Sequence, residues 1–317
     1  MTNRIHQNGD PDWAIRAQAF AALERLAIST GGPIPWAEIS KGFLHQGERI
    51  HFAGRALGIF KPRQMTAALS VRTAMPRAGR PTWYRDQRAE LDVETGLLPY
   101  DLARKSASHT NSALELAHQR RAPLIYFRAV RPALYEAIFP VWVGDFRADE
   151  GRVLLAAESP ARGDTVPDEW PQPYASIGER ERSYSLRTAR HRNHQAWFSK
   201  HVRSVYGYRC AFSNLPLGKL LVGAHIKADE EGGPASVSNG ICMSTLHHAA
   251  FDSYLIGVDP DLKIHVSRNI FDADDGPLLA SLQGLDGATL RVPQMREARP
   301  DRGFLEWRFD KFRAVQG

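Results

Sequence analysis

The pattern of apolar and polar positions begins with helical spacing. Residues 13–29 place Phe20, Leu23 and Leu26 on one side of a segment rich in helix-forming residues. The stretch TGGPIP then ends this helix, and WAEISKGF at 36–43 has the composition of a second, shorter one. The chain is therefore expected to start with a small helical lead-in.

From about residue 48 to residue 156 the pattern changes to short runs typical of strands. Each run is rich in β-branched or aromatic residues and is bounded by turn residues. The runs are RIHFAG, AALSVRT, PLIYFRAV, FPVWVGDF and RVLLAAE. Between them, TNSALELAHQRRAP predicts a helix with Thr110 or Asn111 near its N-cap. Several strands with one or two helices favour a curved sheet or barrel.

A segment rich in Pro, Gly and polar residues, SPARGDTVPDEWPQPYASIG, lacks any periodicity and predicts a linker at 159–178. A length of 317 residues is long for one hydrophobic core. We therefore expect an α+β protein with one domain at 1–158 and a second at 179–317.

The second domain opens with a basic segment, 179–208, which predicts a long helix. Its arginines and lysines outnumber its two glutamates, Glu179 and Glu181. The segment is either a solvated helix face or a basic arm that neutralises phosphates. The DNA-binding candidates on it are Arg187, Arg190, Arg192 and Lys200. Farther on, LKIHVS, GPLLASLQG, ATLRVP and RGFLEWRFDKF predict two strands and two helices.

Composition narrows the class of protein. The net charge of +6 and the isoelectric point near 9.4 favour a polyanionic partner without establishing one. No apolar run approaches the roughly 20 residues of a membrane span, and the polar first residues are not a signal peptide. Cys210 and Cys242 are too few for a disulfide framework, which favours a reducing, cytoplasmic setting and no membrane partner.

Residues 220–252 concentrate histidine and acidic side chains in the order strand, loop, strand, helix. Ser244 or Thr245 is expected to open the helix, on which His248 and Asp252 are four residues apart and face the same way. An imidazole and a carboxylate on one helical face, opposite His225 on a strand, suit a divalent cation. The alternative is that His248 and Asp252 simply pair with each other.

The motifs AHI, NG and LHHAAFD resemble those of the HNH (ββα-metal) nucleases, in the form common in bacterial restriction enzymes. The resemblance covers about residues 195–315. It implies that His225 is the catalytic general base and that Asn239 braces the loop between the strands. It also implies that His248, nine positions after Asn239, binds the metal. Asp252 matches a second helical ligand of the colicin-type members.

The chain departs from that family pattern at two places. Many members carry a metal ligand just before the base, where this chain has Ala224, so other positions around the cation would fall to water, phosphate or Asp229. Many also bind a structural zinc through two Cys-x-x-Cys pairs. Here Ser213 stands three residues after Cys210, where the second cysteine of a pair would be, and Cys242 has no partner cysteine. The expected cofactor is a divalent ion, Mg²⁺, Mn²⁺, Co²⁺ or Ni²⁺, and no structural zinc is expected.

The front half resembles the amino-terminal module attached to HNH domains in restriction endonucleases, a module compared with PUA-like readers of modified bases such as SRA and EVE domains. Aromatic faces and polar groups suit recognition of a base outside the duplex. The alternative is that these aromatic residues pack in the core. The candidates are Trp83, Tyr84 and Asp86, with Tyr100, Tyr126 and Phe127 beside them.

The sequence thus predicts a PUA-like curved sheet or barrel followed by a ββα-metal nuclease domain. The expected function is metal-dependent endonuclease cleavage of double-stranded DNA that carries modified bases. The alternative is a retired HNH protein that binds DNA or RNA, an alternative kept open by Ala224. A double-strand cut by one such site per chain calls for two protomers, which leaves a homodimer open.

Overall fold

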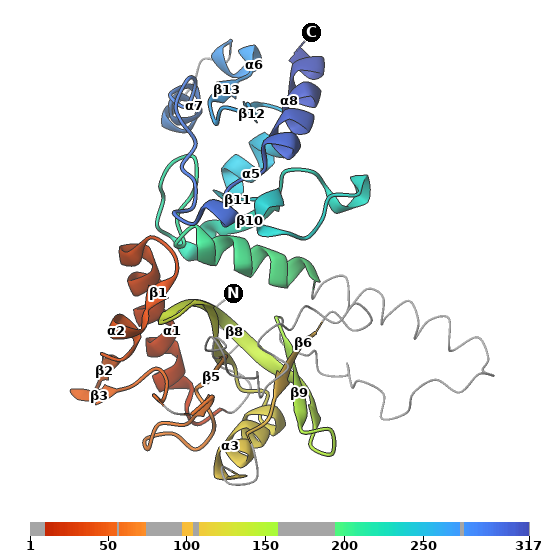
Figure 1. Ribbon diagram of the computed structural model, residues 1–317. Coiled ribbons are helices and arrows are strands. Elements are labelled where there is room, and N and C mark those ends of the chain that lie inside the picture. The colour runs from red at the N-terminus through yellow and green to blue at the C-terminus, as the bar shows by residue number, and fades with distance from the viewer. Residues whose placement is uncertain are drawn as a thin grey trace, which may run out of the picture. The chain divides into compact units, whose positions relative to one another are not determined.

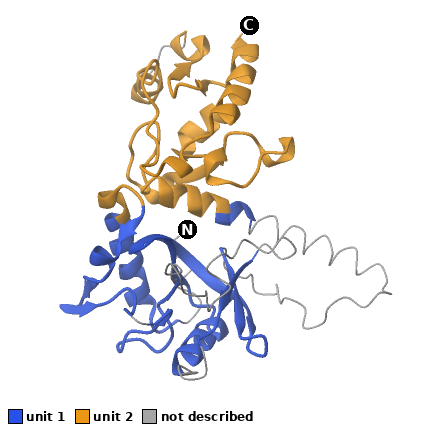
Figure 2. Cartoon of the chain, viewed as in Figure 1, with its two compact units in different colours: residues 1–26, 33–197 blue, residues 27–32, 198–317 orange. Residues whose placement is uncertain are grey.

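The computed structural model describes residues 10–55, 57–73, 97–103, 108–157, 194–272 and 276–316. The chain divides into two compact units (Figure 2). Unit 1 comprises residues 1–26 and 33–197, and unit 2 comprises residues 27–32 and 198–317. The predicted linker at 159–178 lies outside the described residues, so the predicted domain limits stay predictions.

Within the described part of unit 1, seven strands form one curled sheet that resembles half a barrel (Figure 1). The path runs β4 (Ile59–Phe60), β5 (Ser70–Arg72), β7 (Leu124–Arg131), β8 (Leu134–Arg147), β9 (Arg152–Ala156) and β6 (Leu98–Asp101), and β1 (Ile34–Pro35) also pairs with β8. The β5–β7 pair is parallel and the other pairs are antiparallel. Register shifts interrupt both ladders of β8, which is how a strand of 14 residues bends. The mixed α/β class and the curved sheet are confirmed, and the PUA-like relationship stays a prediction.

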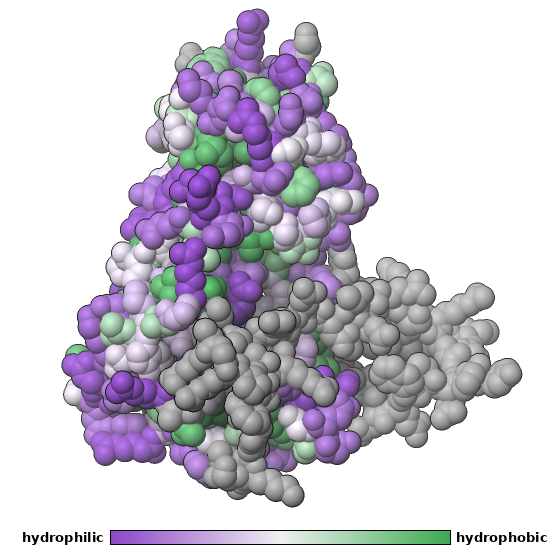
Figure 3. Space-filling model, viewed as in Figure 1, coloured by the Kyte–Doolittle hydropathy of each residue, from purple (hydrophilic) through white to green (hydrophobic). Residues whose placement is uncertain are grey.

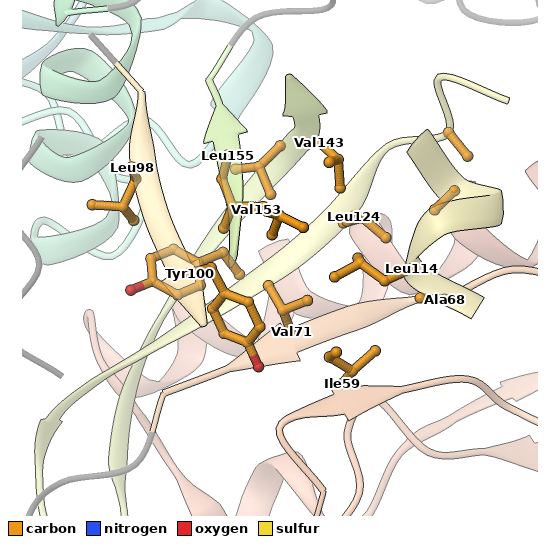
Figure 4. Packing of buried hydrophobic residues seen from close by; sticks show 14 of the residues in the cluster. Ile59, Ala68, Val71, Leu98, Tyr100, Leu114, Leu124, Val143, Val153 and Leu155 are labelled. Atoms are coloured by element: carbon orange, nitrogen blue, oxygen red, sulfur yellow. The ribbon is translucent and has the colours of Figure 1, made fainter. Parts of the chain in front are cut away.

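The core of unit 1 lies between this sheet and α3 (Ser108–Gln119), which packs against β8. Strand residues such as Val71 and Leu124 point toward Leu114 of the helix (Figure 4). The helix begins at Ser108, before the predicted caps. Asn111 instead holds Ala103, accepting its N–H at 2.9 Å and donating to its carbonyl at 2.8 Å.

The predicted lead-in consists of α1 (Trp13–Thr30), α2 (Trp36–Ile39) and a hairpin of β2 (Phe43–His45) and β3 (Glu48–Ile50). The expectation that Phe43 ends a helix is wrong. Gly42 has φ +69, and a Cβ there would lie 2.2 Å from the carbonyl oxygen of Ile50. This close approach ends the helical stretch and starts the hairpin, and it admits only glycine.

A buried arginine attaches α1 to the rest of unit 1. Arg16 is fully buried, and its Nη1 donates to the carbonyl oxygens of Ala68 at 2.6 Å and Pro123 at 3.0 Å. Its Nε pairs with Asp10 at 2.7 Å, which supplies a counter-charge for the buried guanidinium. The helix is therefore held by polar contacts as well as by its apolar face.

Unit 2 begins within a helix that runs over residues 194–205. The elements that follow are β10 (Leu221–His225), β11 (Gly240–Ser244), α5 (Thr245–Asp252), β12 (Ile256–Val258), β13 (Ile264–Val266), α6 (Arg268–Phe271), α7 (Gly276–Gln283) and α8 (Arg302–Gln316). The predicted strand at 288–293 is wrong, because this segment makes only one isolated bridge, from Thr289 to Lys263. The partner of β13 is β12, which the sequence did not indicate.

On the face shown in Figure 3, hydrophilic residues cover most of the described surface and hydrophobic residues are scattered among them. Among the described residues, no helix is both long enough and apolar enough to cross a membrane.

Candidate active site

The candidate site is built on the hairpin of β10 and β11 and on α5, which packs against both strands. In the antiparallel register His225 lies opposite Gly240, at the end where the connecting loop leaves the hairpin. Ser244 opens α5, since its Oγ accepts the backbone N–H of His247 at 3.3 Å. The predicted order of strand, loop, strand and helix is therefore present.

Two glycines let the hairpin lie close to the helix at 194–205. A Cβ at Gly223 would lie 2.8 Å from the Cα of Ser199, and a Cβ at Gly240 would lie 2.4 Å from a methyl group of Val202. Any side chain at either position would push strand and helix apart. The hairpin is thus seated directly on this helix.

His225 is packed on one side and lacks a partner at one nitrogen. Its ring stacks on Phe198, with centroids 3.6 Å apart and an interplanar angle of 5°. Its Nε2 is buried and has no hydrogen-bond partner in the described part of the chain. Burial lowers the pKa of His225, and the nearby charge of Asp229 opposes that shift only in part. The imidazole is therefore neutral near pH 7, which is the form that accepts a proton.

Asn239 is completely buried and holds the loop that links the two strands. Its Oδ1 accepts the N–H of Lys227 at 2.9 Å, and its Nδ2 donates to the carbonyls of Lys227 and Pro234, also at 2.9 Å. A Cβ at Gly233 would lie 1.9 Å from the Lys227 carbonyl oxygen, which shows how tightly the loop is folded. Asn239 therefore fixes the backbone just after His225.

His248 and Asp252 lie on the exposed side of α5, with side chains 39% and 56% exposed. His248 Nε2 is 3.1 Å from Asp252 Oδ2. The spacing is that of a hydrogen bond. It also suits two adjacent ligands of one cation, because donors about 2.1 Å from a metal at a right angle lie about 3 Å apart. A neutral imidazole and a carboxylate are suitable donors for the expected ions, so the pair fits a divalent cation.

In the part of the chain that the structure describes, no other acidic, histidine or cysteine side chain extends the pair into a larger cluster. Over the described residues, no group of three or more His, Cys, Asp and Glu could hold a metal ion. The remaining neighbour of Asp252 is basic, since Arg308 Nη2 lies 3.6 Å from its Oδ1. Water and substrate phosphate would have to supply the other positions around a cation.

His247 faces a different environment from His248, as expected for adjacent residues of a helix. Its Nδ1 lies 2.6 Å from Ser244 Oγ and 3.4 Å from Cys210 Sγ. Burial would raise the pKa of Cys210, but hydrogen bonds with His247 and Ser213 lower that pKa to about 6. Burial raises the pKa of the other free cysteine, Cys242, to about 12. This cluster ties the start of α5 to the segment before β10.

The predicted DNA-binding residues that the structure describes are mostly buried. Lys200 lies in the helix at 194–205 and is only 9% exposed, which leaves little of it for a phosphate contact. Tyr100, Tyr126 and Phe127 are buried, as in the alternative of core packing. The remaining candidates, which lie outside the described residues, are Trp83, Tyr84, Asp86, Arg187, Arg190 and Arg192.

Sequence reasoning missed two residues that touch the site, Phe198 and Arg308. Nothing in the local pattern singles out Phe198, which reaches His225 only through the fold. Arg308 carried a signal, because it lies between Leu305 and Phe312 on the apolar face of α8. A basic residue on such a face indicates a specific buried partner.

Comparison with known proteins gives one family match. Residues 210–259 match the family model HNH_2, described as HNH endonuclease. No curated protein matches the chain. Among solved structures the chain is similar to a "Modification dependent TagI restriction endonuclease", at 15% identity and a TM-score of 0.28, over 81% of this chain and 85% of that one. That TM-score is too low to establish a shared overall fold. The family match supports a nuclease, and it places an HNH endonuclease domain at residues 210–259 within unit 2.

Proposed function

We propose that the chain is a metal-dependent endonuclease that hydrolyses phosphodiester bonds in double-stranded DNA. The observation that carries this proposal is the state of His225. Burial favours its neutral form, its Nε2 has no hydrogen-bond partner among the described residues, and it ends a strand that packs against the helix bearing His248 and Asp252.

In this proposal His225 accepts the proton of the water that attacks phosphorus. A base with a pKa below its usual value is still unprotonated at neutral pH, so it can take up a proton as the oxygen–phosphorus bond forms. Phe198 fixes the plane of the imidazole through their stacking contact. Asn239 fixes the backbone two residues later. Both residues act through position rather than through contact with the substrate.

His248 and Asp252 would hold the divalent cation. When bound, such a cation supplies positive charge that stabilises the pentacovalent transition state and the leaving 3′-oxygen. His248 must be unprotonated at Nε2 to act as a ligand, which leaves the proton on Nδ1. Asp252 would use Oδ2, the oxygen that already lies next to His248.

The direct test is plasmid cleavage by the full chain with Mg²⁺, Mn²⁺, Co²⁺ or Ni²⁺, and with excess EDTA. His225→Ala should lower the cleavage rate by at least about 10²-fold, the usual contribution of a general base. His265→Ala is the matched control. His265 lies on β13, away from the β10–β11 hairpin, and pairs with Asp259, so its substitution should leave cleavage unchanged. Near wild-type cleavage by His225→Ala would remove this residue from the mechanism.

A second experiment addresses the cation. His248→Ala and Asp252→Ala should each raise the cation concentration needed for half-maximal cleavage. Asp252 could also orient His248 without binding the ion itself, in which case its substitution has the smaller effect. Undiminished cleavage in EDTA would exclude a cation at this pair.

A non-enzymatic function, DNA or RNA binding by a retired HNH protein, is favoured by one specific observation. Arg308 places a guanidinium 3.6 Å from Asp252, so the positive charge beside this carboxylate is already supplied by the protein. Ala224 also removes a ligand position that many HNH nucleases use. DNA binding without cleavage under all four cations is the result expected of that function.

We further propose that residues 1–158 select the DNA, with preference for modified bases, and that residues 179–317 cut it. The support is the resemblance of the front half to modified-base readers and the confinement of the HNH match to unit 2. Digestion of one plasmid grown in hosts with different DNA modifications tests this. Trp83→Ala and Tyr84→Ala should erase the preference, because stacking contributes about 1–3 kcal/mol per base. Equal digestion of all plasmid preparations would refute modification dependence but not the nuclease proposal.

A further inference from the structure

A cluster of two lysines and one tryptophan lies beside the candidate active site, and the proposed function assigns no role to it. Lys227 follows His225 by two residues, and two residues span at most about 7 Å. Trp307 and Lys311 are four residues apart on α8 and so share one face of that helix. All three side chains are partly exposed. Lys227 lies in the loop after β10, whereas Trp307 and Lys311 lie on α8. These two parts of the chain are far apart in sequence, so only the fold brings the three residues together.

The indole of Trp307 holds both ammonium groups. Lys311 Nζ lies 4.1 Å from the ring centroid, and Lys227 Nζ lies 5.3 Å from it. Each contact is within the range of a cation–π interaction. Two like charges at one ring repel each other, and an anion placed between them would remove that repulsion.

Among the described residues, one carboxylate supplies a counter-charge to this cluster. Glu231 forms an ion pair with Lys311. Within the described part of the chain, no carboxylate forms an ion pair with Lys227. Asn239 forms hydrogen bonds with both the backbone N–H and the backbone carbonyl of Lys227. The Lys227 side chain therefore extends from a rigid loop. The cluster is therefore a preformed cationic surface next to the proposed base.

We propose that Lys227, Trp307 and Lys311 form a platform that binds the phosphodiester backbone of the DNA strand next to the phosphate being cut. This inference rests on the proposed function for its substrate. The two ammonium groups contact phosphate oxygens, and Trp307 holds them in place. Glu231 releases Lys311 to the phosphate, so the exchange of one counter-anion for another accompanies DNA binding.

The test is binding of a fluorescein-labelled DNA duplex to the full chain, in EDTA, across 50–200 mM KCl. The double variant Lys227→Gln/Lys311→Gln should lower the slope of log affinity against log salt by about two, since each phosphate contact contributes about 0.9. If variant and wild type bind equally at 1 M salt, a slope that is lower by about 1.8 leaves the variant with roughly 30-fold lower affinity at 0.15 M salt. Trp307→Leu should weaken binding at least threefold and keep the full slope, because it retains both charges.

The matched control is Arg302→Gln/Arg313→Gln, which removes two positive charges from the same helix. Both arginines are highly exposed and pair with Asp261 and Asp310 rather than with the platform. The slope of the control should differ from the wild-type slope by less than about 0.45, which is half the contribution of one phosphate contact. An equal loss of slope in the lysine variant and in the control would overturn the platform, as would no loss in either.

Failure of the platform and failure of the proposed function give different results. If the wild-type chain cuts DNA and the lysine variant binds as the wild type does, the platform is wrong and the nuclease proposal stands. If the wild-type chain cuts no DNA under any of the four cations but the lysine variant loses its salt slope, the nuclease proposal is wrong and the platform stands as a surface that binds the DNA backbone.

Discussion

Replacing Arg308 with methionine should destabilise α5 and its surroundings by about 2–4 kcal/mol. Arg308 lies on α8, is 7% exposed, and donates through Nη2 to the carbonyl oxygen of Phe251 at 2.7 Å. Its guanidinium carbon lies 4.6 Å from the ring centroid of Phe251 and 4.3 Å from that of Tyr254. Methionine retains an apolar chain of similar length but makes none of these polar contacts.

The magnitude follows from the contacts that are lost. A hydrogen bond from a charged donor contributes about 1.5–3 kcal/mol, and each of the two stacking contacts adds about 0.5–1 kcal/mol, which sums to about 2.5–5 kcal/mol. Contacts between the methionine sulfur and the same rings offset part of this loss, which leaves about 2–4 kcal/mol. The nearby Asp252 is more than half exposed, so its attraction to Arg308 adds little. The Phe251 carbonyl keeps a second donor, the backbone N–H of Tyr254 at 3.2 Å, so no further cost arises from an unpaired acceptor.

Amide hydrogen exchange of α5 is the suitable assay, because it reports on this region rather than on the whole chain. A loss of 2–4 kcal/mol corresponds to exchange about 30- to 1,000-fold faster. Arg302→Met is the control, since Arg302 is an exposed residue of the same helix and its pair with Asp261 is a surface contact. If the two variants exchange within tenfold of each other, the contacts of Arg308 do not hold α5.

Four further predictions concern the same region. Ser244→Ala removes the N-cap of α5 and should destabilise that helix by about 0.5–2 kcal/mol, seen as faster exchange of its amides. Phe198→Leu exposes His225 and should raise the pKa of that histidine toward 6.5. The acid limb of the pH profile of cleavage should then move to higher pH. An unmoved limb would show that Phe198 does not keep water from the imidazole ring. In the wild type, unfolding free energy should fall as pH drops below 6.5, because the unfolded His225 takes up its proton first. Gly240→Ala places a methyl group 2.4 Å from Val202 and should destabilise unit 2 by about 1–3 kcal/mol, and an unchanged Tm would refute that clash.

The parts of unit 2 that could be predicted from sequence depend on local patterns. The hairpin and α5 were predictable because a short apolar strand, a turn and a serine N-cap each leave a local signal. Strand β12 has only three residues and is fixed by pairing with β13 and packing against α8, so its sequence alone carries too little information. The segment 288–293 has the composition of a strand, but its pairing with the hairpin is limited to one bridge, between Thr289 and Lys263, with two backbone hydrogen bonds around it.

The candidate site divides along the same line. The register that brings His225 to the end of its strand, and the helical spacing of His248 and Asp252, can be read from residue order. The stacking of Phe198 on His225 joins residues 27 positions apart and could not be. A local pattern can therefore identify candidate site residues, but not what buries them or shifts their pKa.

Helix α8 lies outside the segment that matches the HNH family model, yet it touches that segment at two places. Arg308 packs beneath α5 and approaches Asp252, while the preceding residue, Trp307, gathers Lys227 and Lys311 beside the loop after His225. Adjacent helical residues point about 100° apart, so one helix can contact α5 with one side chain and the loop after His225 with the next. The segment 210–259 therefore lacks some of the residues that hold the candidate site in place. A change in the packing of α8 should alter the support of both groups together.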